Sequence, residues 1–379
     1  MNIKFKRAYN RGATLTDGIL KVCDGRFDGI THENGTADLD LSSYRVFPGF
    51  IDMHTHGAVG YDSLKASFDE LDKLSNHYAS CGVSTFLVTM STAPLALLEH
   101  QFGMVSDRIE AGTSGASIGG IYAEGPYLCA KFRGAHSEPL LRTPNVDEAK
   151  RLIEAGRGNL RVFTVAPELP GAIDMIEYLV KNGVKVSLGH TAATMEEARL
   201  GMDAGANILV HTYNAMAGLN HRNVGLLGMG LVRDDAYCEI ICDFIHVCPE
   251  AVKIVLRCKN SDKVVLITDS VEPTGMPDGE YILSDLECIV KDGIARTKEG
   301  ALAGSSLRSN RALQNVVETL DVPIETAAKM LTINPATALG LDHEIGALDR
   351  GYRAHLTALD ENYNVVLTMV DGKIVYDNR

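Results

Sequence analysis

Two histidines near the start of the chain are spaced so that they could share a metal ion. His54 and His56 follow the apolar run Phe50–Met53 and precede Gly57. Residues two apart on a strand point to the same side, so both imidazoles would lie on one face. This spacing can hold one divalent ion, although a pair of structural histidines would give the same pattern.

A second group combines one carboxylate with two further histidines. Glu124 ends an apolar run directly before Gly125-Pro126, so it is expected at a rim of the fold. His190 and His211 each end another run, at a separation that suits neighbouring strands joined by a helix. Two imidazoles and one carboxylate suit a catalytic zinc or iron site with open positions for water. The alternative is a salt-bridged rim carboxylate beside two structural histidines.

A further carboxylate and a further histidine could take part in catalysis. Asp269 ends the last apolar run. A carboxylate beside a metal-bound water can take its proton and later give it to a leaving group. An Asp that caps a helix is the other interpretation. His136, in the polar loop Arg133–His136, could polarise a carbonyl group.

The loops also contain residues that could bind an anionic substrate. Arg222 follows the run that ends in His211, and His246 follows the next run. Together they could hold a phosphate by charge-assisted hydrogen bonds, although a solvated surface Arg is the ordinary alternative. The stretch Gly300–Ser306 has backbone amides that could contact a ligand, but it lacks the Gly-Lys-Ser/Thr of a phosphate loop.

These residues need a scaffold that brings distant segments together. Eight apolar runs recur along the middle of the chain, at residues 49–53, 84–90, 118–122, 160–166, 184–188, 207–210, 238–242 and 263–267. Helical spacing of apolar residues predicts helices between them, including 68–81, 146–155, 195–204 and 249–259. Strand–helix alternation predicts a parallel sheet, and eight units favour a closed (β/α)₈ barrel over an open sheet. The carboxyl ends of barrel strands share one face, where the polar residues would converge.

The two ends of the chain have a different pattern. Short strands are predicted at residues 13–15, 18–23, 29–31, 356–359, 365–370 and 373–376. Asp17-Gly18, Asp24-Gly25 and Asp371-Gly372 predict turns between them. We predict that residues 1–48 and 343–379 form one small β-sandwich domain, and that residues 49–342 form the barrel.

Composition excludes several other classes of protein. The chain has 379 residues, 45% of them hydrophobic, which suits one large folded domain with a minor one. A net charge of −13 disfavours a role in binding nucleic acid or an anionic membrane. We expect no transmembrane helix and no signal peptide, because long apolar runs are absent. The eight cysteines form no Cys-x-x-Cys pair, which favours reduced thiols and a cytoplasmic location.

Taken together, the motifs resemble those of the N-acetylglucosamine-6-phosphate deacetylases, a family within the amidohydrolase superfamily. The resemblance is carried by Pro48–Gly57, Glu124-Gly125-Pro126, Gly134-Ala135-His136, Gly189-His190-Thr191, His211-x-x-Asn214-Ala215-Met216, Thr268-Asp269 and Leu302-x-Gly304-Ser305. The first motif is common to many amidohydrolases. The Glu124, His136 and His211 motifs, taken together, are more specific to this family. Two positions depart from the usual pattern: Phe244 replaces Gly, and Arg133 replaces Lys.

The resemblance implies an activity and a role for each site residue. The reaction would be hydrolysis of the acetamide of N-acetylglucosamine 6-phosphate, with one or two divalent ions (zinc, iron or another transition metal) per subunit. Glu124, His190 and His211 would hold the main ion, and His54 and His56 a second. Asp269 would be the general base and then acid, and His136 would polarise the acetyl carbonyl. The substrate would be bound by Ala135, Asn214, Ala215, Arg222, His246, Leu302, Ala303, Gly304 and Ser305, with Arg222 reaching the neighbouring active site of a homodimer.

Three other functions are alternatives for the same residues. A deacetylase for the galactosamine isomer remains open, because the motif residues do not read the configuration of one hydroxyl. A cyclic-amide hydrolase usually carries a carboxylated lysine at the fourth strand, and residues 161–166 contain no Lys. A non-catalytic barrel relative is expected to have lost metal ligands, and this chain retains them all.

Overall fold

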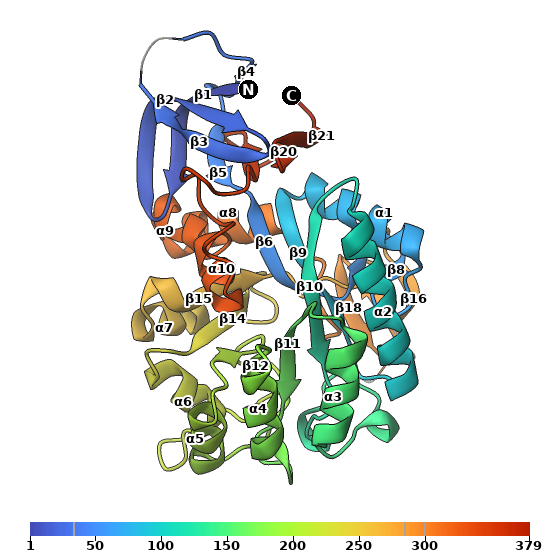
Figure 1. Ribbon diagram of the computed structural model, residues 1–379. Coiled ribbons are helices and arrows are strands. Elements are labelled where there is room, and N and C mark those ends of the chain that lie inside the picture. Colours follow the sequence, from blue (N-terminus) through green and yellow to red (C-terminus); the bar gives the residue numbers. More distant parts are fainter. Residues whose placement is uncertain (33–34, 284–285, 299) are drawn as a thin grey trace.

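The barrel is built from eight parallel strands that lie far apart in the sequence. The computed structural model describes residues 1–32, 35–283, 286–298 and 300–379. In spatial order the central sheet runs β15-β14-β13-β12-β11-β10-β9-β6. The strands are β6 (Phe50–Thr55), β9 (Val83–Met90), β10 (Ser117–Glu124), β11 (Leu160–Val165), β12 (Lys185–Leu188), β13 (Ile208–Leu209), β14 (Tyr237–Ile241) and β15 (Val264–Ile267). Each predicted apolar run forms one of them, which confirms the (β/α)₈ fold (Figure 1).

The sheet closes between its last and first strands. Ser270, just after β15, pairs in parallel with Thr55 of β6. The backbone amide of Asp269 also donates a hydrogen bond to the carbonyl of His54 at 3.0 Å. Every residue of β6, β9 and β14 is buried, as expected for strands covered on both faces.

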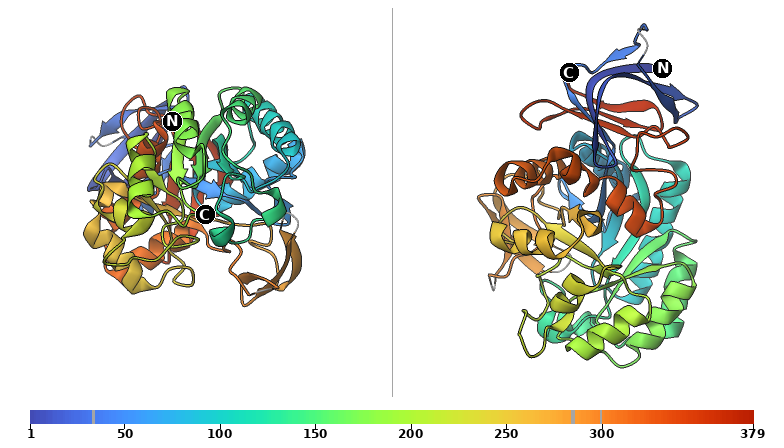
Figure 2. Two further views of the ribbon diagram at one scale, coloured as in Figure 1. Left: turned by 90° about the horizontal axis from the view of Figure 1, so that it is seen from below. Right: turned by 90° about the vertical axis from the view of Figure 1, so that its left-hand side faces the viewer.

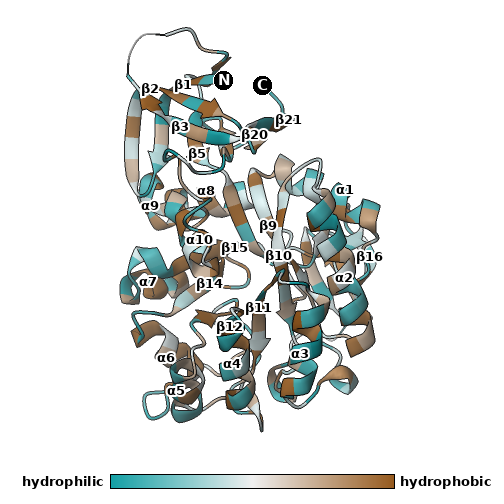
Figure 3. Cartoon of the chain, viewed as in Figure 1, coloured by the Kyte–Doolittle hydropathy of each residue, from teal (hydrophilic) through white to brown (hydrophobic). Residues whose placement is uncertain are grey.

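Helices surround these strands. They are α1 (Phe68–Ser80), α2 (Leu95–Ala111), α3 (Val146–Ala155), α4 (Ala172–Lys181), α5 (Met195–Asp203), α6 (Gly225–Val232), α7 (Pro249–Cys258) and α8 (Ser309–Leu320). Side-chain caps start three of them, α1, α3 and α5. Ser67 and Glu70 form a capping box at the start of α1, and Thr194 and Glu197 form another at α5. The four predicted helices agree with the structure to within one residue at each end. Hydrophilic and hydrophobic residues alternate along helices such as α3 and α7 (Figure 3).

Strands from both chain ends form a second sheet beside the barrel. Its order is β21-β20-β19-β5-β1-β2-β3, with β4 paired to β1. The strands are β1 (Asn2–Asn10), β2 (Ala13–Cys23), β3 (Arg26–Thr31), β4 (Leu39–Asp40), β5 (Arg45–Pro48), β19 (Leu356–Leu359), β20 (Val365–Val370) and β21 (Lys373–Asp377). This sheet has its own hydrophobic core, which includes Phe5, Phe27 and Leu367. Both termini lie at this sheet (Figure 2). The domain boundaries near residues 48 and 343 stay a prediction.

One predicted turn in this sheet is wrong. Asp17-Gly18 does not join two strands but lies inside the single strand β2. The pairing with β1 passes from Phe5–Gly18 to Arg7–Thr16, so Asp17 has no paired residue and takes φ of 48°. The Asp-Gly signal therefore marks an irregularity of the strand, because the unpredicted strand β1 pairs on both sides of it. The turns at Asp24-Gly25 and Asp371-Gly372 are confirmed.

A small antiparallel sheet follows the last barrel strand and was not predicted. It consists of β16 (Gly279–Leu283), β17 (Leu286–Lys291) and β18 (Ile294–Thr297) and projects from the barrel (Figure 2). Val271 and Ala303 pack in one cluster with Cys288, Val290 and Ala295 of this sheet. The sheet thereby supports the segments that follow β15 and β18. Two short helices, α9 (Ile324–Lys329) and α10 (Ile333–Leu339), precede the return to the terminal sheet. Across the described residues, no helix has the length and hydropathy to span a membrane.

Candidate active site

A cavity at the carboxyl ends of the barrel strands collects most of the predicted site residues. Those that line it are His56, Glu124, Ala135, His136, His190, His211, Asn214, Ala215, His246, Asp269, Leu302, Ala303 and Gly304. They come from segments spread over some 250 positions of the chain, and they meet because parallel strands end on one face of a barrel.

Three predicted residues do not line this cavity. His54 is fully buried, next to the lining residue His56. Ser305 is also buried, and its hydroxyl donates to the carbonyl of Thr268, which ties its loop to the end of β15. Arg222 is exposed on the loop before α6, where its backbone amide donates to Asn220 Oδ1.

Glu124, His190 and His211 form the first candidate metal group. Glu124 Oε1 lies 2.8 Å from His211 Nε2 and 3.2 Å from His190 Nε2, and the two ring nitrogens are 3.0 Å apart. All three residues are buried and each directs one potential ligand atom to a common point.

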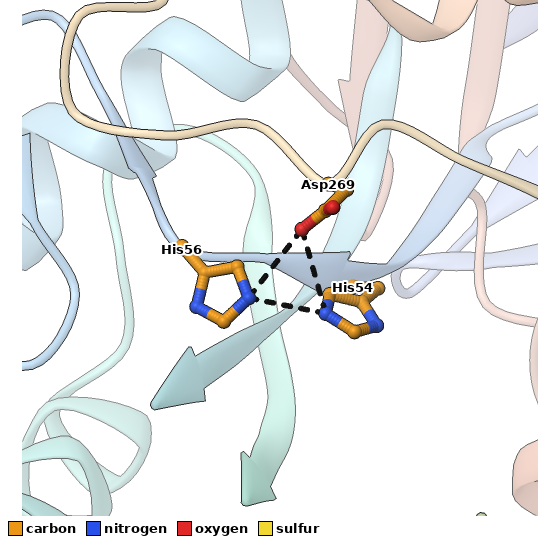
Figure 4. Close-up of side chains that lie close together, drawn as sticks. All are labelled: His54, His56 and Asp269. Carbon is orange, nitrogen blue, oxygen red and sulfur yellow. Dashed lines mark hydrogen bonds and ion pairs between the residues drawn. The ribbon is translucent and has the colours of Figure 1, made fainter. Parts of the chain in front are cut away.

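His54, His56 and Asp269 form the second candidate metal group (Figure 4). The Nε2 atoms of the two histidines are 3.1 Å apart, and Asp269 Oδ1 lies 3.6 Å from that of His54 and 3.4 Å from that of His56. Glu124 adjoins this group as well, because its Oε2 lies 3.0 Å from His56 Nε2. Glu124 therefore contacts both groups, the first through Oε1 and the second through Oε2.

Hydrogen bonds at Nδ1 distinguish a ligand histidine from a donor histidine. His190 Nδ1 lies 2.9 Å from the carbonyl oxygen of Phe132, which can only accept, so Nδ1 carries the proton and Nε2 keeps its lone pair. His136 has the opposite arrangement, because the amide of Thr92 donates to its Nδ1 at 3.2 Å. In neutral His136 the proton therefore sits on Nε2, which lies 3.3 Å from Glu124 Oε2. His136 is suited to donate a hydrogen bond, and His190 to bind a cation.

The pKa shifts at the site reflect strong burial among facing charges. Burial lowers the pKa of His190 to about 4. Burial would raise the pKa of Glu124, but His54 and hydrogen bonds from His136, His190 and His211 hold it well below its ordinary value. Burial would lower the pKa of His54, but Glu124 and Glu239 raise it well above its ordinary value. The carboxylates thus favour positive charge at the centre of the site.

The donor atoms fit a divalent transition metal. Imidazole nitrogens and carboxylate oxygens are the ligands that such ions take in hydrolytic sites. Nε2 lone pairs facing each other at 3.0 and 3.1 Å repel unless a proton or a cation lies between them. Each group offers three protein ligands, which leaves coordination positions for water and substrate.

Several site residues adopt a left-handed backbone. The φ angles are 46° at His190, 23° at His211, 49° at Ala215 and 51° at Asp269. Non-glycine residues rarely adopt this region, and such strain clusters where the surrounding structure fixes a functional side chain. At His211 and Asp269 the bend comes just as a barrel strand ends and directs the side chain across the barrel mouth.

The cavity lining also includes a group suited to an anion, His246. His246 is held by Asp243, whose carboxylate accepts from Nδ1 at 2.7 Å and from the backbone amide at 2.8 Å. This leaves His246 Nε2 available to a ligand. Phe244, in the same loop, has φ of 63°, a conformation that Gly adopts without strain, and its ring packs against the barrel core. Phe in place of Gly therefore adds an apolar contact between this loop and the barrel core, and it requires a strained backbone conformation at residue 244.

Sequence reasoning missed several residues at the site. Asp62, Ser91 and Glu272 line the cavity, and Asp52 and Glu239 are fully buried beneath it. A signal existed for the last two, because each is an acidic residue inside an apolar barrel strand. For the others the sequence offers only ordinary polar loop residues.

The chain belongs to the amidohydrolase family, whose sequence profile matches residues 45–375. It is 38% identical to the N-acetylglucosamine-6-phosphate deacetylase of Vibrio furnissii over 351 residues, 93% of this chain and 87% of that protein. It is 37% identical to the N-acetylgalactosamine-6-phosphate deacetylase of Escherichia coli O157:H7, over 98% of each chain.

Solved structures agree with these sequence relatives. N-acetyl-D-glucosamine-6-phosphate deacetylase from Mycobacterium smegmatis, as a variant in complex with N-acetyl-D-glucosamine-6-phosphate, superposes with a TM-score of 0.95 and 31% identity, over 99% of each chain. The Thermotoga maritima deacetylase gives a TM-score of 0.91 and 32% identity, over the full length of both chains. The family resemblance inferred from the motifs is confirmed.

Proposed function

We propose that this protein hydrolyses the acetamide of N-acetylglucosamine 6-phosphate to glucosamine 6-phosphate and acetate. The observation that carries the proposal is the meeting of Glu124, His190 and His211 around one point, with Asp269 and His136 beside it. The relatives named for this reaction, in bacteria and animals, support the same substrate.

Glu124, His190 and His211 would hold the main ion, and His54, His56 and Asp269 would hold a second. A divalent ion bound there supplies Lewis acidity, which polarises the carbonyl and makes water a better nucleophile. The ion would be zinc, iron or another transition metal.

Asp269 moves the protons of the reaction. It accepts a proton from the attacking water as the new carbon–oxygen bond forms. It then gives that proton to the sugar nitrogen, so that the carbon–nitrogen bond breaks and the amine leaves. His136 donates from Nε2 to the carbonyl oxygen as negative charge develops there.

The phosphate is assigned to His246, Asn214 and Ala215, and the sugar and the acetyl group to Ala135 and Leu302–Gly304, all of which line the cavity. Arg222, exposed and outside the cavity of its own subunit, completes the phosphate site of the neighbouring subunit in a homodimer. Ser305 contributes by fixing the loop, through its hydrogen bond to Thr268.

The galactosamine isomer is the second candidate substrate. A relative that matches 98% of the chain is named for it, at an identity within one per cent of the glucosamine relative. The two sugars differ in the configuration of one hydroxyl, so the metal and phosphate groups of the site serve both.

Acetate release by the metal-loaded protein tests these assignments. The substrates are the 6-phosphates of N-acetylglucosamine and N-acetylgalactosamine and both free sugars. We expect the highest kcat/KM with N-acetylglucosamine 6-phosphate and a much higher KM for the free sugar. No acetate from any phosphorylated sugar would contradict the proposed function, and a preference for the galactosamine isomer would favour the second candidate.

We further propose a cytoplasmic location and a division into the barrel, residues 49–342, and the β-sandwich domain of residues 1–48 and 343–379. All eight cysteines are free thiols in the structure, as expected in a reducing compartment.

A further inference from the structure

Glu239 is a fully buried acidic residue that the proposed reaction does not use. It lies in the middle of β14, whose five residues are all buried. Its Oε2 atom is 3.1 Å from Nδ1 of His54 and 3.2 Å from the backbone nitrogen of His211. These two histidines belong to different metal groups. Its other oxygen, Oε1, has no hydrogen-bond partner in the described part of the chain.

The contact with Glu239 sets the proton position on His54. A carboxylate accepts hydrogen bonds, so Nδ1 of His54 carries a proton, and Nε2 is the nitrogen left to bind a cation in place of a second proton. That Nε2 faces His56 Nε2 at 3.1 Å and Asp269 Oδ1 at 3.6 Å. The ring of Tyr122 packs on His54 with centroids 4.7 Å apart, which limits rotation of the imidazole.

We propose that Glu239 is a positioning residue that makes the His54–His56–Asp269 group a binding site for a second ion. A carboxylate hydrogen-bonded to the far nitrogen of a histidine orients the ring and raises its basicity as a ligand. The inference deepens the proposed function and rests on its metal chemistry.

The charge of Glu239 supports the same conclusion. A carboxylate in a dry interior is costly unless positive charge lies close to it. Glu239 contacts Nδ1 of His54. A cation bound to Nε2 of the same ring would therefore place positive charge close to the buried carboxylate of Glu239. Glu239 therefore favours a cation at His54 more than at His190, whose Nδ1 faces a neutral carbonyl.

The rival explanation is that Glu239 only fixes the backbone at the end of β13 through the amide of His211. That role would affect the ion held by Glu124, His190 and His211, since His211 is one of its ligands. The two explanations therefore differ in which ion is weakened.

Metal titration without substrate separates them. Metal-free protein is titrated with Co²⁺, followed by its visible absorption, and with Zn²⁺ in equilibrium dialysis with metal analysis. The variants are Glu239→Gln, which keeps the shape and an accepting oxygen but removes the charge, and Glu239→Leu, which removes both. Cys238→Ala, on the same buried strand, is the matched control, and near-ultraviolet circular dichroism verifies folding.

We expect the natural protein and Cys238→Ala to bind two ions per chain. In Glu239→Gln the second ion should bind roughly 10-fold more weakly, and in Glu239→Leu roughly 100-fold, with a much smaller change at the first ion. Binding of a single ion by the natural protein, unchanged affinity for the second ion, or equal weakening of both ions would overturn the proposal. Acetate release is measured separately, so failure of the proposed function is distinguished from failure of this inference.

Discussion

At the scale of single residues, the partner of each Nδ1 atom determines what a histidine can do. His190 donates from Nδ1 to a backbone carbonyl, whereas His136 accepts there from the amide of Thr92. The first arrangement leaves a lone pair on Nε2 for a cation, and the second leaves a proton for an oxyanion. Two histidines in one cavity thus have opposite chemical roles.

Asp269→Asn should abolish turnover and leave the ion at Glu124, His190 and His211 in place. The amide keeps the size of the side chain but cannot accept the proton of the attacking water, so kcat should fall at least about 10²–10⁴-fold. Acetate release and metal analysis of the same sample measure both effects. A near-normal rate of acetate release by this variant would show that Asp269 is not the general base.

Substitution of His136 tests its role as a donor. His136→Ala should lower kcat about 10²–10³-fold with little change in KM, because the hydrogen bond to the oxyanion forms in the transition state. His136→Gln should recover part of this loss, since an amide can accept from Thr92 and still donate. Equal rates for the two variants would speak against a hydrogen-bonding role.

At the scale of elements, strand ends and turns place the chemistry. His190, His211 and Asp269 follow strands and adopt positive φ, so the chain bends where the side chain must enter the barrel mouth. Away from the site, Asp371 in the turn between β20 and β21 forms hydrogen bonds with side chains of the segment just before β19. Asp371 accepts from Arg353 at 2.7 Å and 2.6 Å, and His355 Nε2 lies 3.2 Å from the same carboxylate.

Asp371→Asn should lower the stability of the terminal sheet in a pH-dependent way. Burial would raise the pKa of Asp371, but hydrogen bonds from His355 and Arg353 hold it below its ordinary value. The carboxylate therefore contributes stability above the unfolded pKa of about 3.9, which is lost as pH falls through the lower folded pKa. The carboxylate is partly exposed, so we expect a loss of about 1 kcal/mol at pH 7.

Thermal unfolding of both proteins between pH 7 and pH 3 measures this difference. The gap in Tm should stay constant from pH 7 to pH 5 and narrow below pH 4. A gap that widens towards acid pH would contradict the assignment.

At the scale of the whole molecule, closure of the barrel brings together residues from its first and last strands. The closure between β6 and β15 sets His54 and His56 opposite Asp269. Arg222 remains outside the cavity of its own subunit, which agrees with the proposal that it acts on a partner.

Mixed dimers test that proposal. Arg222→Ala alone should raise KM for the phosphorylated sugar at least about 10-fold, because a charge-assisted hydrogen bond is lost. Dimers of one Arg222→Ala and one Asp269→Asn subunit should contain one complete site, with an intact Asp269 and the partner's Arg222. We therefore expect about half the natural kcat at the natural KM. A mixed dimer with the high KM of the Arg222 variant would place Arg222 at the site of its own subunit.

The sequence by itself determined the eight barrel strands and the residues at their ends. Apolar runs and helical spacing are local patterns, so they predict elements such as β14 and α3 without knowledge of their neighbours. Glu124, His190, His211 and Asp269 could be selected because a polar residue after an apolar run is visible in one dimension.

Only the tertiary structure decided how these residues are paired. Glu239 and His54 are 185 positions apart, and their contact depends on closure of the sheet, which no local pattern encodes. The same holds for the Nδ1 partners of His136 and His190, which come from loops whose path depends on packing. Strand β1 and the sheet of β16, β17 and β18 were missed. Strand β1 does carry a local signal, because its buried Ile3 and Phe5 alternate with exposed lysines. Local sequence thus sets which side chains are present at the barrel mouth, while long-range packing sets the hydrogen bonds that give each one its role.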